Sequence, residues 1–134
     1  MDAGSKALNH LDPEGGVHMV DVGAKEPTRR EAVARGKVRM SPNTLELICS
    51  GEMPKGDVFT VAQVAGIMAA KRTPEIVPLC HPLPLTGIQV RLLPNHQESA
   101  VEVEARASLY AKTGAEMEAL TAVTASCLAV YDMC

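Results

Sequence analysis

Alternation of apolar and polar residues is clearest over residues 100–110. Within this stretch the odd-numbered positions hold valine, alanine or leucine, and the even-numbered positions from 102 to 108 hold Glu, Glu, Arg and Ser. A period of two is typical of a strand with one buried face. Weaker alternation predicts three more strands, over residues 18–22, 31–40 and 87–93.

Apolar residues at three- and four-residue spacing, together with capping signals, predict the helices. Four are expected: one from Ser41-Pro42 to near Gly51, one capped by Asp57 and running to about Lys71, a short one at Thr73-Pro74, and one from about Gly114 to the end. The last helix is apolar on almost every side. It should therefore be buried against more than one neighbour, with the sheet on one side and another subunit as an open alternative on the other.

The order strand, helices, strand, strand, helix predicts an α+β fold of the ferredoxin-like kind, an antiparallel sheet with helices packed on one face. One further strand would complete that fold. Either the fold lacks this strand, or it lies in a tail outside the sequence. The 134 residues fit a single domain, residues 1–134, in which residues 1–16 form a flexible N-terminal arm.

Composition excludes several classes of function. Aromatic residues make up only 2% and the formal net charge is −3, which argues against a nucleic-acid-binding surface. No apolar run is long enough for a membrane span or a signal peptide, so we expect a cytoplasmic protein. The four cysteines lack zinc-site spacing and are expected to be free thiols. A metal site at Cys80-His81 is a weaker alternative.

Two segments hold side chains suited to acid–base chemistry. Prolines between Val77 and Pro84 predict a stiff loop that fixes Cys80 and His81. A histidine there could titrate near neutral pH, although a structural hydrogen bond is the more frequent role. Lys55 lies between a proline and a glycine, where a fixed and partly desolvated lysine can take part in proton transfer.

Cations cluster at predicted element boundaries, where they suit a polyphosphate or are simply solvated. They include Arg30, Lys71 and Arg72. For the last two, the dipole at a helix C-terminus offers another explanation.

Acidic residues lie at both ends of the last predicted helix. Glu116 fits a capping box with Thr113, but no cap explains Glu118. Asp132 opposes the helix dipole and so needs a cationic partner or a catalytic role. Since Glu118 and Asp132 are fourteen residues apart, they lie ~21 Å apart along the helix. If both line one pocket, they come from different chains, and the site lies between subunits.

Several sequence motifs resemble those of one family, cyclic pyranopterin monophosphate synthase, the molybdenum cofactor biosynthesis protein C family. The motifs are His18–Val22, Thr28–Ala32, Pro54–Val58, Ala69–Thr73, Pro78–Leu83, Gly114–Thr121 and Tyr131–Cys134. They occur in the family's order from about His10 onward. The resemblance implies a ferredoxin-like homohexamer, a trimer of dimers with active sites between subunits. It further implies no metal and no organic cofactor.

The implied reaction converts a cyclised dihydro-GTP into a pyranopterin with a cyclic phosphate and releases diphosphate. By motif, the family's catalytic residues fall on Asp132 and Lys55. The same motifs place the family's substrate-binding residues at Leu79, Cys80, His81, Glu116, Met117, Glu118 and Arg30. We add Lys71 and Arg72 as candidate ligands of the diphosphate. The family continues past Cys134 with a second lysine and a final strand, so we expect these in a tail outside the sequence. A non-catalytic nucleotide-binding or regulatory module is the alternative if the chain ends there.

Overall fold

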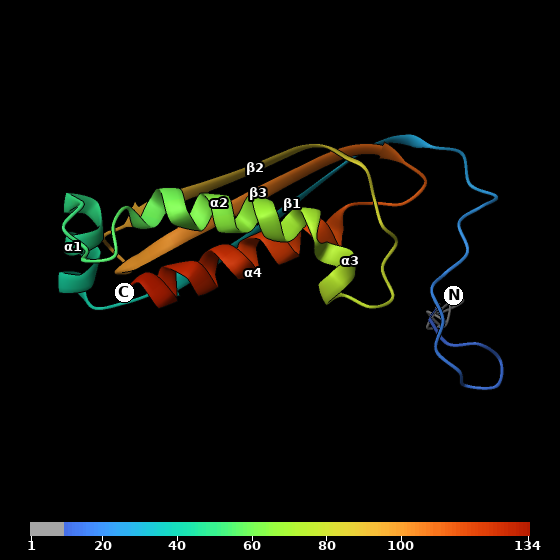
Figure 1. The fold of residues 1–134 in the computed structure, drawn as a ribbon, viewed down its shortest axis with the longest axis horizontal. Helices are drawn as coiled ribbons and strands as arrows, with labels where there is room; N and C mark the ends of the chain where they lie inside the picture. Colours follow the sequence, from blue (N-terminus) through green and yellow to red (C-terminus); the bar gives the residue numbers. More distant parts are fainter. Residues whose placement is uncertain (1–9) are drawn as a thin grey trace, which may run out of the picture.

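The computed structural model describes residues 10–134 as a three-stranded antiparallel sheet covered on one face by helices (Figure 1). The strands, in the order β1-β3-β2, are β1 (Thr28–Arg39), β2 (Leu85–Asn95) and β3 (Ala100–Ala111). The helices are α1 (Pro42–Ser50), α2 (Val58–Lys71), α3 (Thr73–Ile76) and α4 (Glu116–Met133). This arrangement confirms the predicted ferredoxin-like α+β fold. The single-domain division stays a prediction.

The core between sheet and helices is built largely from small residues. Ala62 of α2 and Ala122 of α4 are fully buried, as are Ala105 and Ala107 of β3. Gly66 lets α2 approach α4 so closely that an added Cβ would lie 3.0 Å from the Ala122 carbonyl oxygen. Close packing of two helices and a sheet therefore takes the place of large aromatic side chains, of which the chain has only three.

Local signals account for two helix starts. The Ser41 side chain accepts from Thr44 N at 3.2 Å, and Asp57 Oδ1 accepts from Thr60 N at 3.3 Å. Hydrogen bonds from Thr60 lower the pKa of the exposed Asp57 carboxyl. The predicted capping box is wrong: α4 begins at Glu116, and Ala115 occupies the N-cap position without a side-chain hydrogen bond.

The N-terminal segment differs most from the prediction. Residues 18–22 are not a strand, because no other strand pairs with them. Within the arm predicted over residues 1–16, residues 1–9 lie outside the described part, and Leu11 forms an isolated antiparallel bridge with Val17. The segment then passes along one end of the sheet before it enters β1 (Figure 1).

Candidate active site

Lys55 and Asp132 meet at the C-terminal end of α4. Lys55 Nζ donates to the main-chain oxygen of Asp132 at 2.7 Å and lies 3.6 Å from Asp132 Oδ1. The cation thus supplies the partner that an acid at a helix C-terminus requires. Both side chains are open to solvent, 57% and 76% exposed. More than half of the Lys55 side chain is exposed, so in the chain taken alone this lysine is at most partly desolvated.

Glu118 anchors a second cluster at the N-terminal end of α4. It is only 3% exposed, and its Oε2 atom has no hydrogen-bond partner in residues 10–134. Burial raises the pKa of the Glu118 carboxyl, with a smaller contribution from the charge of Glu116. Burial and then the charge of Glu118 raise the pKa of the half-buried Cys80 thiol. The acid and the thiol therefore share one poorly solvated environment.

His81 lies in the same proline-rich loop as Cys80 and is half-buried. Its Nε2 atom lies 2.5 Å from the main-chain oxygen of Val20, sixty-one positions away in the sequence. Sequence reasoning missed this contact, because a main-chain carbonyl has no signature in the sequence. The only related signal was the alternation over residues 18–22, which leaves Val20 and Val22 half-buried.

The remaining predicted residues are distributed around the Glu118 end. Arg30 of β1 is half-buried, and within the described chain its Nε atom has no hydrogen-bond partner. Lys71 and Arg72 are exposed at the end of α2. Lys71 borders a hollow of about 440 Å³ whose other lining residues are Ile67, Leu83, Leu85, Thr86, Gly87 and Ile88. Leu79 is half-buried, whereas Glu116 and Met117 are exposed on the first turn of α4.

The two clusters are held apart by one uninterrupted helix. Glu118 and Asp132 both belong to α4, which spans 18 residues. At 1.5 Å per residue their fourteen-residue separation is ~21 Å. In Figure 1 the loop after α3 lies near one end of α4, and the loop between α1 and α2 lies at the other. Lys55 with Asp132 and Cys80 with Glu118 are thus two separate groups within one chain.

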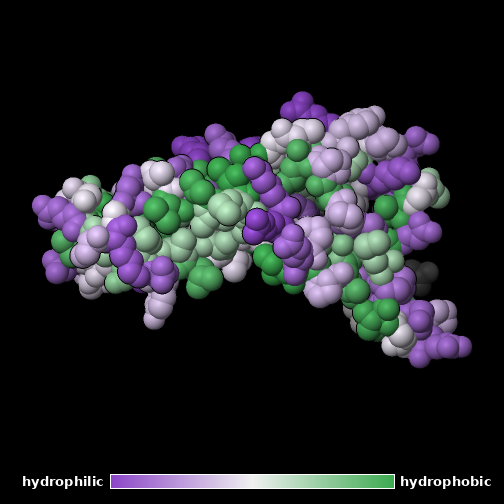
Figure 2. All heavy atoms as spheres, in the orientation of Figure 1, coloured by the Kyte–Doolittle hydropathy of each residue, from purple (hydrophilic) through white to green (hydrophobic). Residues whose placement is uncertain are grey.

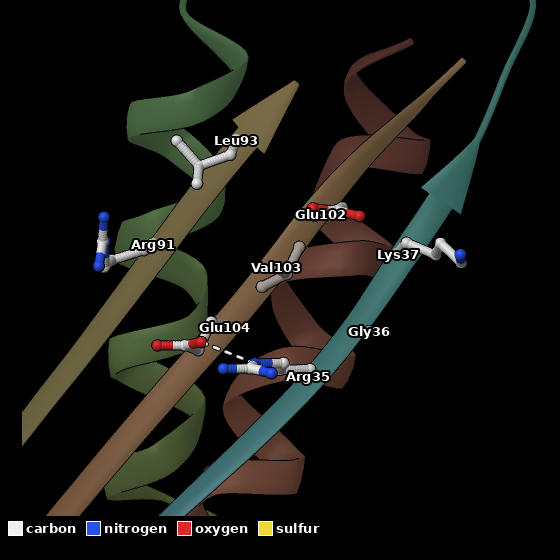
Figure 3. Close-up of a pocket in the computed structure, with 8 residues that line it drawn as sticks. All are labelled: Arg35, Gly36, Lys37, Arg91, Leu93, Glu102, Val103 and Glu104. Atoms are coloured by element: carbon white, nitrogen blue, oxygen red, sulfur yellow. Dashed lines mark hydrogen bonds and ion pairs between the residues drawn. The ribbon is translucent and has the colours of Figure 1, made fainter. Parts of the chain in front are cut away.

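A larger hollow, of about 490 Å³, lies on the sheet face that carries no helices (Figure 3). Arg35 Nε donates to Glu104 Oε2 at 2.7 Å there, and Arg91 faces Glu104 from β2. None of the predicted site residues lines it. Exposed pairs of this kind contribute little to stability, so the hollow is a solvated charged face.

Comparison with known proteins adds to this geometry. A sequence profile described as the MoaC family matches residues 19–134. The chain belongs to this family.

Curated relatives of this MoaC-family chain carry one name, cyclic pyranopterin monophosphate synthase. The protein of that name from Pelotomaculum thermopropionicum is 65% identical over 127 residues, 95% of this chain and 75% of the relative. Its counterpart from Roseiflexus sp. is 57% identical and covers 95% of this chain and 80% of the relative. The one from Chloroflexus aurantiacus is 54% identical over all 134 residues, 82% of the relative.

Within residues 10–134 of the MoaC-family chain, no three His, Cys, Asp or Glu side chains are grouped to hold a metal ion. The four cysteines have free thiols. No helix in this part of the chain is long and apolar enough to cross a membrane.

Proposed function

We propose that this protein is a cyclic pyranopterin monophosphate synthase, a lyase that converts 3',8-cyclo-7,8-dihydro-GTP into cyclic pyranopterin monophosphate and diphosphate. The observation that carries the proposal is 65% identity, across 95% of the chain, to a relative of that name. The two residues of the Lys55–Asp132 pair come from the motifs Pro54–Val58 and Tyr131–Cys134, which resemble those of the family. The free thiols fit a reducing compartment, and we place the protein in the cytoplasm.

Rearranging the purine-derived ring requires several proton transfers. Lys55 and Asp132 provide a cation and a carboxylate in contact, which suits the passage of a proton between substrate and solvent. Glu118 keeps its proton to a higher pH than an ordinary glutamate, because burial raises its pKa. It is therefore suited to donate a proton, while His81 and Glu116 complete the set of exchanging groups.

Forming the cyclic phosphate requires a substitution at phosphorus. A ribose-derived hydroxyl attacks the innermost phosphorus, its proton passes to a base, and the bond to the diphosphate oxygen breaks. Cations stabilise the leaving diphosphate. Arg30, Lys71 and Arg72 supply this positive charge at the Glu118 end of α4. Leu79, Cys80 and Met117 are the expected contacts to the ring system, and no metal or organic cofactor is expected.

The two clusters complete one site when two chains pack with antiparallel α4 helices. The exposed side of α4 carries an apolar stripe of Met117, Leu120, Leu128 and Tyr131, and α2 adds Val61, Val64 and Met68. Figure 2 shows apolar residues gathered over these two helices. Antiparallel packing brings Asp132 of one chain toward Glu118 of its partner, since the helix N-terminus then faces the partner's C-terminus. This pair is the unit of the proposed homohexamer, a trimer of dimers.

Turnover is the direct test of the proposal. The protein is incubated with 3',8-cyclo-7,8-dihydro-GTP, and mass spectrometry follows the pyranopterin product, the diphosphate and the protein mass together. Release of both products establishes the lyase. Bound but unchanged substrate contradicts the proposal and favours the non-catalytic nucleotide-binding or regulatory module.

Mixed assemblies test the shared site. Lys55→Ala and Glu118→Gln are co-expressed and compared with each variant alone. If each site takes one group from each chain, random mixing restores about a quarter of wild-type activity, because one site in four receives both intact groups. Co-expression of Lys55→Ala with Asp132→Ala is the matched control and restores none, since these residues meet within one chain. Equal recovery in both mixtures contradicts the shared site.

A further inference from the structure

The segment Val20–Gly23 lies against both loops that border the cluster of Glu118 and Cys80. At one end the main-chain oxygen of Val20 is 2.5 Å from His81 Nε2. At the other, Lys112 Nζ, just after β3, donates to the main-chain oxygen of Gly23 at 3.2 Å. We call residues Val20–Gly23 the bridging segment. It links the loop after α3 to the loop that leads into α4.

Internal hydrogen bonds hold the bridging segment in one shape. Gly23 N donates to Asp21 Oδ1 at 2.8 Å, and Lys25 N donates to the Val22 main-chain oxygen at 3.0 Å. Val20 and Val22 are half-buried, whereas Asp21 is exposed. The valines therefore face the body of the protein, and the turn that follows them orients the Gly23 carbonyl toward Lys112.

A carbonyl oxygen accepts hydrogen bonds and cannot donate one, so the proton in the His81 contact belongs to Nε2. A neutral imidazole with its proton on Nε2 has its lone pair on Nδ1. We infer that the bridging segment is a positioning element for His81: it selects the Nε2–H tautomer and leaves Nδ1 as the atom that accepts a proton from the substrate. A backbone carbonyl suits this task, because it has no charge and cannot titrate.

This inference rests on the proposed function for the use of Nδ1, but the tautomer itself can be measured without turnover. The full chain is labelled with ¹⁵N in its four histidines, and long-range proton–nitrogen NMR assigns each ring. The His81→Gln variant identifies the His81 signals. We expect His81 as a single Nε2–H tautomer, while His96, in the exposed β2–β3 turn, reports an unconstrained ring. A His81 ring protonated on Nδ1, or averaged as His96 is, overturns the inference.

Lys112→Met tests the role of the far attachment. Losing the contact to Gly23 loosens the bridging segment, so the His81 tautomers begin to mix and kcat falls by about tenfold, a part of the roughly 100- to 10,000-fold that a general acid or base contributes. KM stays within about twofold, because a positioning role affects proton transfer and not ground-state binding. Lys25→Met is the matched control: it changes an exposed lysine beside the same segment and leaves both the tautomer and kcat unchanged.

The outcomes separate the two proposals. A rise in KM with an unchanged His81 tautomer in Lys112→Met makes Lys112 a substrate contact and overturns the positioning role of its attachment. An unchanged tautomer and an unchanged kcat overturn it as well. If the wild-type protein releases no diphosphate while His81 holds the Nε2–H tautomer, the bridging segment keeps its effect on the ring and the proposed function fails.

Discussion

Replacing Gly66 by alanine tests how closely the helices and the sheet are packed. A Cβ on Gly66 would lie 3.0 Å from the Ala122 carbonyl oxygen and 3.1 Å from Val90 Cγ2, and would overlap the Ser126 hydroxyl. The hydroxyl can rotate away, but the carbonyl is main chain in α4, and Val90 is a buried β-branched side chain with little freedom to turn. The methyl group must therefore push α2 away from α4 or the sheet.

Two opposing terms set the size of the effect. Alanine in a helix interior is favoured over glycine by about 1 kcal/mol. Overpacking a well-filled core costs about 1–3 kcal/mol, and two fixed neighbours place Gly66→Ala toward the upper end. We expect the free energy of unfolding to fall by about 1–2 kcal/mol after the propensity gain is subtracted.

Urea unfolding followed by far-UV circular dichroism measures this free energy at one protein concentration, because the proposed association would contribute to stability. Ser126→Ala is the matched variant. Alone it loses the hydrogen bond from Ser126 Oγ to the Ala62 carbonyl oxygen, worth about 1 kcal/mol. In the double variant the overlap with the hydroxyl is gone, so the combined loss is smaller than the sum of the single losses. A Gly66→Ala protein more stable than wild type by about 1 kcal/mol would refute the close approach.

Three further changes address the site. Lys55→Ala should abolish release of diphosphate while far-UV circular dichroism and the free energy of unfolding stay near wild type, because the ammonium is exposed; turnover near the wild-type rate contradicts its role. Glu118→Gln should gain stability relative to wild type as the pH rises above about 4.5, since burial raises the folded-state pKa and ionisation then penalises only the wild-type fold. Urea titrations from pH 4.5 to 8 measure that difference, and parallel curves for the two proteins rule it out. Lys71→Ala should raise KM with little change in kcat, as expected for a diphosphate contact. If steady-state kinetics show an unchanged KM, Lys71 is a solvated surface residue and not a substrate contact.

Local patterns in the sequence predicted most of the fold. The alternation over residues 100–110 became β3, and Ser41 and Asp57 cap the helices that they were expected to cap. These features depend on neighbours within a few residues. The alternation over residues 18–22 misled, because half-burial of Val20 and Val22 produces the same pattern as a paired strand.

Local patterns of this kind do not predict contacts between residues that are far apart in the sequence. Lys55 and Asp132 are seventy-seven positions apart, and only the folded chain brings them together. Because an acid at a helix C-terminus is unfavourable, the sequence predicted that Asp132 needs a cationic partner or a catalytic role. The sequence pattern alone could not identify that partner, because every lysine and arginine met the requirement equally.

The continuity of α4 also limits how the gene can change. Because Glu118 and Asp132 belong to one helix, an inserted residue between them would move Asp132 by about 1.5 Å and turn it by about 100° around the helix axis. An insertion of seven residues nearly restores the direction but lengthens the helix by about 10 Å. In the proposed shared site, insertions and deletions in this segment would therefore alter either the angle or the reach of Asp132. The proposed shared site therefore predicts that length variation between species is confined to the connecting loops, because both copies need an α4 of the same length.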